Sequence, residues 1–148
     1  MSAPSRMRAM RLHRPGEGLR LDDLPVPAAG PGQLQLRVEA CGVCRTDLHL
    51  VDGELPDPRL PIIPGHEIVG RVTALGDGVR GFRVGQRVGV LWLGWTCGGC
   101  RFCLSGHYWM CQFGYIFGFQ NVVNGGMAKY CLYPATARVH KVPESLEA

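Results

Sequence analysis

Apolar and polar residues alternate along several short stretches of this chain, and glycine or proline residues separate the stretches. The clearest examples are QLQLRVEA (33–40), EIVGRVTAL (67–75), FRVGQRVGVLWL (82–93), MAKYCLYP (127–134) and ARVHKV (137–142). Valine, leucine and isoleucine at every second position, bounded by turn residues, are typical of β-strands. The N-terminal segment 4–14 alternates in the same way and predicts a strand with solvated arginines. The pattern predicts an all-β barrel or sandwich.

Helical periodicity is weak throughout the sequence. No stretch of ten or more residues places apolar positions at helical spacing, and only RTDLHLVDG (45–53) predicts a short helix. The segment 97–111 has neither strand alternation nor helical period. Its order must therefore come from something other than a hydrophobic face.

Composition and charge narrow the class of protein. A chain of 148 residues with 46% hydrophobic and 19% charged residues is typical of one globular domain. The net charge of +4 comes from scattered positive residues, which do not predict a nucleic-acid-binding face. No segment resembles an export signal or approaches the ~20 apolar residues of a membrane-spanning helix. We therefore predict a cytoplasmic protein without a membrane partner, in which clustered cysteines indicate a metal rather than disulfides.

One glycine pattern resembles a dinucleotide-binding fingerprint. Gly76, Gly78 and Gly81 fit the spacing G-x-G-x-x-G. That fingerprint requires a following helix whose N-terminal amides face the pyrophosphate. The residues that follow instead alternate as a strand would, so this segment predicts a β-turn.

Four cysteines gather in the stretch CGGCRFCLSGHYWMC. Cys97, Cys100, Cys103 and Cys111 are spaced x2, x2 and x7. Zinc takes four thiolates in a tetrahedron, and four protein ligands leave no open position for substrate, so the sequence predicts a structural zinc site. An iron–sulfur cluster also uses four cysteines, but common ferredoxin spacings differ from this one. Buried cysteines without a metal are a further alternative.

A second set of metal-binding residue types is dispersed along the chain. CGVCRTDLH (41–49) supplies cysteine, aspartate and histidine, and the triplet GHE (65–67) follows later. Each motif alone is weak evidence for a metal site, because a CxxC pair or a single histidine more often has a structural role. Together they offer a thiolate, an imidazole and carboxylates, the ligand types of a catalytic zinc site that keeps one open position.

These motifs, in this order, resemble the zinc-dependent medium-chain alcohol dehydrogenases. GHEIVGRVTALGDGV (65–79) is similar to the zinc signature of that family, the four-cysteine segment is similar to its structural-zinc loop, and CGVCRTDLH is similar to the segment with its first catalytic ligand. The resemblance covers essentially all 148 residues. It implies a GroES-like β-barrel over residues 1–148, with short helices and an inserted zinc lobe over residues 92–114.

The resemblance also implies the ligands of the catalytic metal. Cys44 is expected to be the first zinc ligand and His66 the second, whereas Cys41 is a neighbouring core thiol. Glu67 is expected behind the metal, where it can approach during ligand exchange. Asp47 is expected to accept a hydrogen bond from the free ring nitrogen of His66 and so to orient the ring.

Further roles follow from the same resemblance. Thr46 is expected to hydrogen-bond the alcohol oxygen, and His49 to pass the released proton to solvent. Arg45 is expected near the pyrophosphate of NAD or NADP. Trp92 and Leu55 are expected to line the substrate pocket. A surface position for His49 and a core position for Trp92 are the alternatives.

The family pattern continues beyond this sequence. Family members are about twice as long, because a Rossmann domain follows and carries the nicotinamide cofactor. Their third catalytic zinc ligand lies a few residues beyond the point corresponding to residue 148. We therefore expect the isolated chain to be inactive, as a part of a homodimeric or homotetrameric parent that oxidises an alcohol or a small polyol.

Two other functions compete with the dehydrogenase. One is a non-enzymatic GroES-like module, a co-chaperone-type barrel, and the four-cysteine lobe and Cys44 with His66 argue against it because a chaperone barrel needs neither. The other is a zinc-ribbon nucleic-acid binder. Residues 97–111 contain one arginine and no lysine, which argues against phosphate binding.

Overall fold

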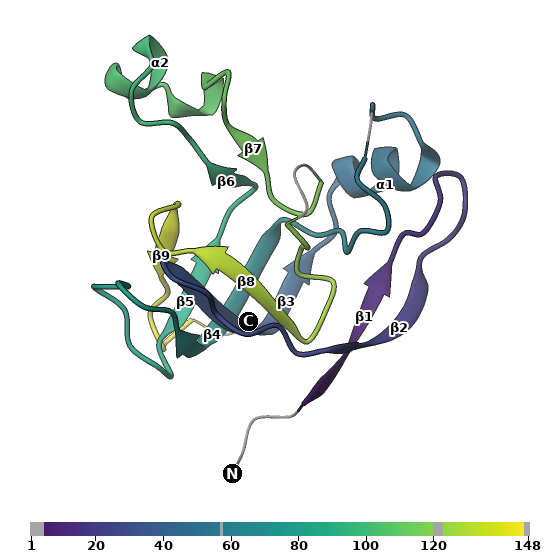
Figure 1. The fold of residues 1–148 in the computed structure, drawn as a ribbon, viewed down its shortest axis with the longest axis horizontal. Coiled ribbons are helices and arrows are strands. Elements are labelled where there is room, and N and C mark those ends of the chain that lie inside the picture. Colours follow the sequence, from purple (N-terminus) through teal and green to yellow (C-terminus); the bar gives the residue numbers. More distant parts are fainter. Residues whose placement is uncertain (1–4, 57, 120–122, 147–148) are drawn as a thin grey trace.

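The computed structural model describes residues 5–56, 58–119 and 123–146, and they form three antiparallel sheets (Figure 1). The strands are β1 (Arg6–Arg11), β2 (Arg20–Pro25), β3 (Gln33–Gly42), β4 (Glu67–Leu75), β5 (Arg87–Val90), β6 (Leu93–Trp95), β7 (Tyr115–Ile116), β8 (Tyr130–Pro134) and β9 (Val139–Lys141). The helices are α1 (Arg45–Asp52), α2 (Arg101–Leu104) and a 3₁₀ helix (Tyr108–Met110). None of the described helices is long and apolar enough to span a membrane. The all-β prediction is confirmed.

The central sheet has five strands in the order β8-β3-β4-β5-β9. Its inward side chains form the main core, whose fully or almost fully buried members are Leu34, Leu36, Ile68, Val72, Val88, Val90, Phe117, Cys131 and Tyr133. Burying one large aliphatic side chain contributes about 1.5–3 kcal/mol. The alternation seen in the sequence is therefore the pattern by which β4 and β5 direct their aliphatic residues to one side of the sheet.

Some observed elements have the bounds that the sequence predicts, and others differ from the prediction. β4 has the bounds that its alternation predicts, and α1 forms where the one short helix was expected. The predicted strand 82–93 is shorter in the structure, because Gly85 has a φ of 85° in the turn before β5. Four elements were not predicted: β2, β7, α2 and the 3₁₀ helix.

The expected zinc lobe, residues 92–114, which contains the four clustered cysteines, projects from the central sheet and carries α2 at its far end (Figure 1). At its base β6 pairs with β7, with Leu93 opposite Ile116. The Tyr133 hydroxyl of β8 lies 3.0 Å from the carbonyl oxygen of Leu91 and 2.8 Å from that of Leu93. This buried tyrosine therefore attaches the base of the lobe to the central sheet.

The three glycines spaced G-x-G-x-x-G lie in the turn between β4 and β5, as expected, and no helix follows them. Gly76 nevertheless has a strict steric role. A Cβ atom at this position would lie 1.7 Å from the carbonyl oxygen of Gly30. The Gly76 amide also donates to the carbonyl oxygen of Gln33 at 2.8 Å. Close backbone packing, rather than phosphate binding, accounts for this glycine.

Replacing Gly76 by alanine is expected to lower the free energy of unfolding by about 2–3 kcal/mol, because the backbone of the neighbouring loop must move. Gly18→Ala is the matched control, since a Cβ there meets no atom within 4 Å. The control should change stability by less than about 0.5–1 kcal/mol. Urea denaturation of both variants measures the difference. Equal stability of the two would contradict the steric role of Gly76.

Candidate metal centres

The four cysteine sulfurs of the lobe converge on one point. Cys100 Sγ lies 3.6 Å from Cys103 Sγ, Cys97 Sγ lies 3.9 Å from Cys103 Sγ, and Cys111 Sγ lies 3.6 Å from Cys97 Sγ. All four sulfurs are within 4.8 Å of one another. Sulfurs bound to one zinc ion at about 2.3 Å are separated by about 3.8 Å in a tetrahedron. The observed spacing therefore fits a four-thiolate metal site.

Backbone amides favour the thiolate form within this cluster. The Cys97 N–H donates to the Cys111 sulfur at 3.5 Å and lowers the pKa of the Cys111 thiol to about 6. The Cys103 amide likewise lowers the pKa of Cys100. Desolvation acts in the opposite direction on Cys103 and raises its pKa to about 11. Metal binding must displace the remaining protons, so metal affinity is expected to rise with pH.

The second centre begins at the N-terminus of α1. Cys44 is the N-cap residue, and its backbone N–H donates to Asp47 Oδ2 at 2.8 Å. The other carboxylate oxygen, Asp47 Oδ1, accepts the backbone N–H of Gly65 at 2.9 Å. Asp47 is only 4% exposed. One buried carboxylate thus connects the segment that holds Cys44 to the segment that holds His66.

Asp47 orients His66 less directly than expected. His66 Nδ1 lies 3.7 Å from Asp47 Oδ1, which is longer than a hydrogen bond. The predicted hydrogen bond is not formed in this geometry. Each carboxylate oxygen of Asp47 instead accepts one backbone amide, so the carboxylate holds together the segments that carry Cys44 and His66.

Cys44, His66 and Glu67 place one ligand atom each within 4.8 Å of the others. His66 is buried, Cys44 is half-buried, and Glu67 is exposed. The three residues line a pocket of 270 Å³. A thiolate, an imidazole and a carboxylate beside an open pocket fit a metal site with room for a further ligand.

Cys41 is adjacent in sequence but does not join this set. Desolvation by burial raises the pKa of its thiol to about 11. Gly65, with a φ of 98°, passes so close that a Cβ there would lie 2.6 Å from Cys41 Sγ. Cys41 is therefore a half-buried thiol that packs against Gly65 and lies outside the candidate ligand set.

Of the remaining expected site residues, two line this pocket and three do not. Thr46 and Trp92 line the pocket, and Thr46 Oγ1 lies 3.7 Å from Cys44 Sγ. Leu55 is not among the residues that line this pocket, and it packs against the cluster formed by Leu12, Leu50, Ile62 and Phe119, as the pocket residue Ile116 does. His49 contacts the Glu54 carboxylate, and Arg45 is exposed at the first turn of α1.

Two residues of this region could not be identified from the sequence motifs. Ile116 of β7 lines the pocket opposite the metal-binding residues. It belongs to a strand of two residues, too short for a periodic signal. Glu54 contacts His49 from the loop after α1. Its position five residues after His49 is compatible with a contact but does not predict one.

Residues 30–144 match the alcohol dehydrogenase GroES-like domain family. The chain is 42% identical over 143 residues to an alcohol dehydrogenase of Moraxella sp. (strain TAE123), covering 96% of this chain and 41% of that protein. It superposes on a cobalt- and zinc-bound thermostable alcohol dehydrogenase from Pyrobaculum aerophilum with a TM-score of 0.86 and 35% identity, covering 96% of this chain and 43% of that one.

An acetophenone reductase from Geotrichum candidum, solved with NAD, is also similar, with a TM-score of 0.84 and 31% identity over 100% of this chain and 43% of that one. The chain thus spans about two fifths of the length of each of these proteins. The expected GroES-like fold is confirmed by the family match. The match also covers both candidate metal centres, and the chain therefore belongs to the alcohol dehydrogenase family, within its GroES-like domain.

Proposed function

We propose that this chain is the catalytic-domain portion of a zinc-dependent alcohol dehydrogenase, which oxidises an alcohol or a small polyol to an aldehyde or ketone. The observation that carries the proposal is the convergence of Cys44, His66 and Glu67 on the open 270 Å³ pocket. A closed four-thiolate cluster forms separately in the lobe. The open site is suited to catalysis, and the closed four-thiolate site is suited to stabilising the fold.

The chain's own residues would bind the alcohol and move its proton. Cys44 and His66 would hold a zinc ion, with Glu67 able to approach it, and the ion would supply a Lewis acid that lowers the pKa of an alcohol hydroxyl. Thr46 lines the same pocket, and its hydroxyl can hydrogen-bond the alcohol oxygen and relay the alcohol proton by releasing its own. His49 is partly exposed beside Glu54 and can release a proton to solvent.

The hydride acceptor in this proposal is NAD or NADP. Arg45 supports it, because this exposed residue follows Cys44 directly in the sequence and has no carboxylate partner among the described residues. A guanidinium is well suited to pair with a pyrophosphate. Trp92 and Ile116 give the pocket an apolar wall that fits the carbon chain of a small alcohol. We propose a homodimeric or homotetrameric parent protein.

Cobalt can replace zinc and report on the open site. Addition of a small alcohol to the cobalt-loaded chain is expected to change the visible spectrum, because only an open site can accept a new ligand. Cys44→Ser should weaken metal binding at this site by about 10–100-fold and abolish the spectral change. Cys41→Ser, three residues upstream, is the matched control and should retain the change.

A non-enzymatic zinc module predicts a different result. Its metal would respond to no alcohol at any concentration, and Cys44→Ser would behave like Cys41→Ser. Either outcome, in a chain that retains the metal of its lobe, would contradict the proposed function.

A further inference from the structure

The second half of the chain has an unbalanced charge. No aspartate or glutamate occurs from Gly78 to Pro143, although the whole chain contains 12 acidic residues. The same segment contains the seven cations Arg80, Arg83, Arg87, Arg101, Lys129, Arg138 and Lys141. Elements from this segment build the lobe and its base. A cationic side chain there has no acidic neighbour in sequence to neutralise it.

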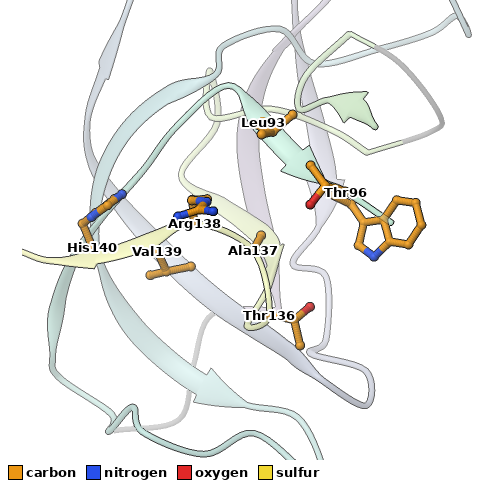
Figure 2. Close-up of a pocket in the computed structure, with 8 residues that line it drawn as sticks. Leu93, Thr96, Thr136, Ala137, Arg138, Val139 and His140 are labelled. Atoms are coloured by element: carbon orange, nitrogen blue, oxygen red, sulfur yellow. The ribbon is translucent and has the colours of Figure 1, made fainter. Parts of the chain in front are cut away.

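Two neighbouring cavities at the base of the lobe share three of their lining residues. Their volumes are 380 Å³ and 370 Å³, and both are lined by Leu93, Arg138 and His140. The larger cavity is shown in Figure 2, between β6 and the segment that joins β8 to β9. Its other lining residues are Trp95, Thr96, Thr136, Ala137 and Val139. No residue that lines either cavity is acidic.

Arg138 is held in place by an aromatic ring rather than by a carboxylate. Its Cζ atom lies 3.2 Å from the centroid of the Tyr108 ring, so the ring supports the guanidinium. None of the carboxylates in the described part of the chain pairs with Arg138. Stacking uses one face of the guanidinium and leaves N–H donors at its edge available. The cation is therefore positioned but not neutralised.

Further polar groups surround this cation. Arg138 and His140 lie on the same side of the ribbon at β9, and Thr96, directly after β6, lines the same cavity (Figure 2). The Thr136 hydroxyl lies at the lower edge of the cavity (Figure 2). No hydrogen-bond partner is found for any of these three additional side chains among the described residues. A guanidinium, an imidazole and two hydroxyls are the groups that bind an anionic oxygen pair.

We propose that the cavity at Arg138 binds a small organic carboxylate. Arg138 binds the carboxylate through its N–H donors, and Thr96 and His140 supply further hydrogen bonds. Leu93 and Ala137 form the apolar wall against which the carbon skeleton of the ligand packs. The cavity volume is within the range of small-molecule sites and exceeds the needs of an inorganic ion.

This site is separate from the candidate metal pocket but near to it. Trp92 lines both the 370 Å³ cavity and the pocket that contains Cys44 and His66. The carboxylate site contains neither Cys44 nor His66. Ligand binding can therefore be measured without an alcohol or a nicotinamide cofactor, and its result is independent of the proposed dehydrogenase function.

Isothermal titration calorimetry with benzoate tests the proposal on the zinc-loaded chain. Benzamide is the neutral control, because it has nearly the same shape without the charge. Arg138→Gln should weaken benzoate binding at least about tenfold, since hydrogen bonds to a charged partner are lost. Lys141→Gln is the matched control, because it removes one charge from β9 at a residue that does not line the cavity. Its affinity for benzoate should stay within about twofold of the original, as expected for a screened surface charge.

Arg138 also stacks on Tyr108, so zinc per chain is measured for each variant to show that the lobe is intact. Arg138→Lys keeps the charge and should bind benzoate with intermediate affinity. Benzamide binding as tightly as benzoate would overturn the proposal. An equal loss of benzoate affinity in Arg138→Gln and Lys141→Gln would also overturn it. So would tighter binding of inorganic phosphate than of benzoate.

Discussion

Replacing Cys111 by serine is expected to remove one zinc ion per chain and to lower the free energy of unfolding by about 3–5 kcal/mol. Cys111 Sγ lies 3.6 Å from Cys97 Sγ and completes the four-sulfur cluster. Neither α2 nor the 3₁₀ helix of the lobe contains a buried residue. The lobe has little hydrophobic core to replace the metal, so losing one ligand should also unfold the segment around it.

Elemental analysis and thermal unfolding measure this effect. Cys131→Ala is a suitable control, because this buried thiol belongs to the main core and to neither metal-binding set. It should lose stability through packing while it keeps its zinc. Excess chelator should destabilise the original chain and leave Cys111→Ser almost unaffected. A Cys111→Ser chain with full zinc content and unchanged unfolding would exclude a structural metal in the lobe.

Hydrophobic periodicity predicted the central sheet well and the small sheets poorly. β4 has nine residues and one buried face, so alternation alone determines its bounds. β2 has the sequence RLDDLP, whose paired aspartates are unfavourable in strands. In the structure Asp23 pairs with Arg6 at 2.6 Å across the β1–β2 hairpin. β2 pairs with β1 along its whole length, and this pairing between residues far apart in sequence forms the strand despite its low propensity, which no local window can show.

In the candidate sites, too, the sequence predicted some residues, and others depend on the three-dimensional fold. Cysteine spacing placed four sulfurs together, because a short segment limits how far its ligands can separate. Cys44 and His66 were assigned by family resemblance, and the structure brings their ligand atoms within 4.8 Å. The wall residue Ile116 was not found, since it reaches the pocket only through the fold of the lobe. Asp47 was expected to bind His66, but its two backbone contacts depend on how α1 approaches Gly65.

A hybrid enzyme allows the proposed chemistry to be measured directly. The chain would replace the matching two fifths of the Moraxella alcohol dehydrogenase, to which it is 42% identical over 143 residues. We expect this hybrid to reduce NAD or NADP in the presence of an alcohol. The chain by itself should not, because its described strands pair only antiparallel and lack the parallel β–α–β unit that binds dinucleotides.

Cys44→Ser in the hybrid should lower kcat/KM by about a thousandfold, because the metal that lowers the pKa of the alcohol is no longer held in place. Cys41→Ser is the matched control, since this protonated thiol lies three residues away and outside the metal-binding set. It should reduce kcat/KM by less than about tenfold, through packing alone. Equal losses in the two variants would show that Cys44 is a structural thiol. Alcohol-dependent reduction by the chain alone would show that these residues suffice for cofactor binding.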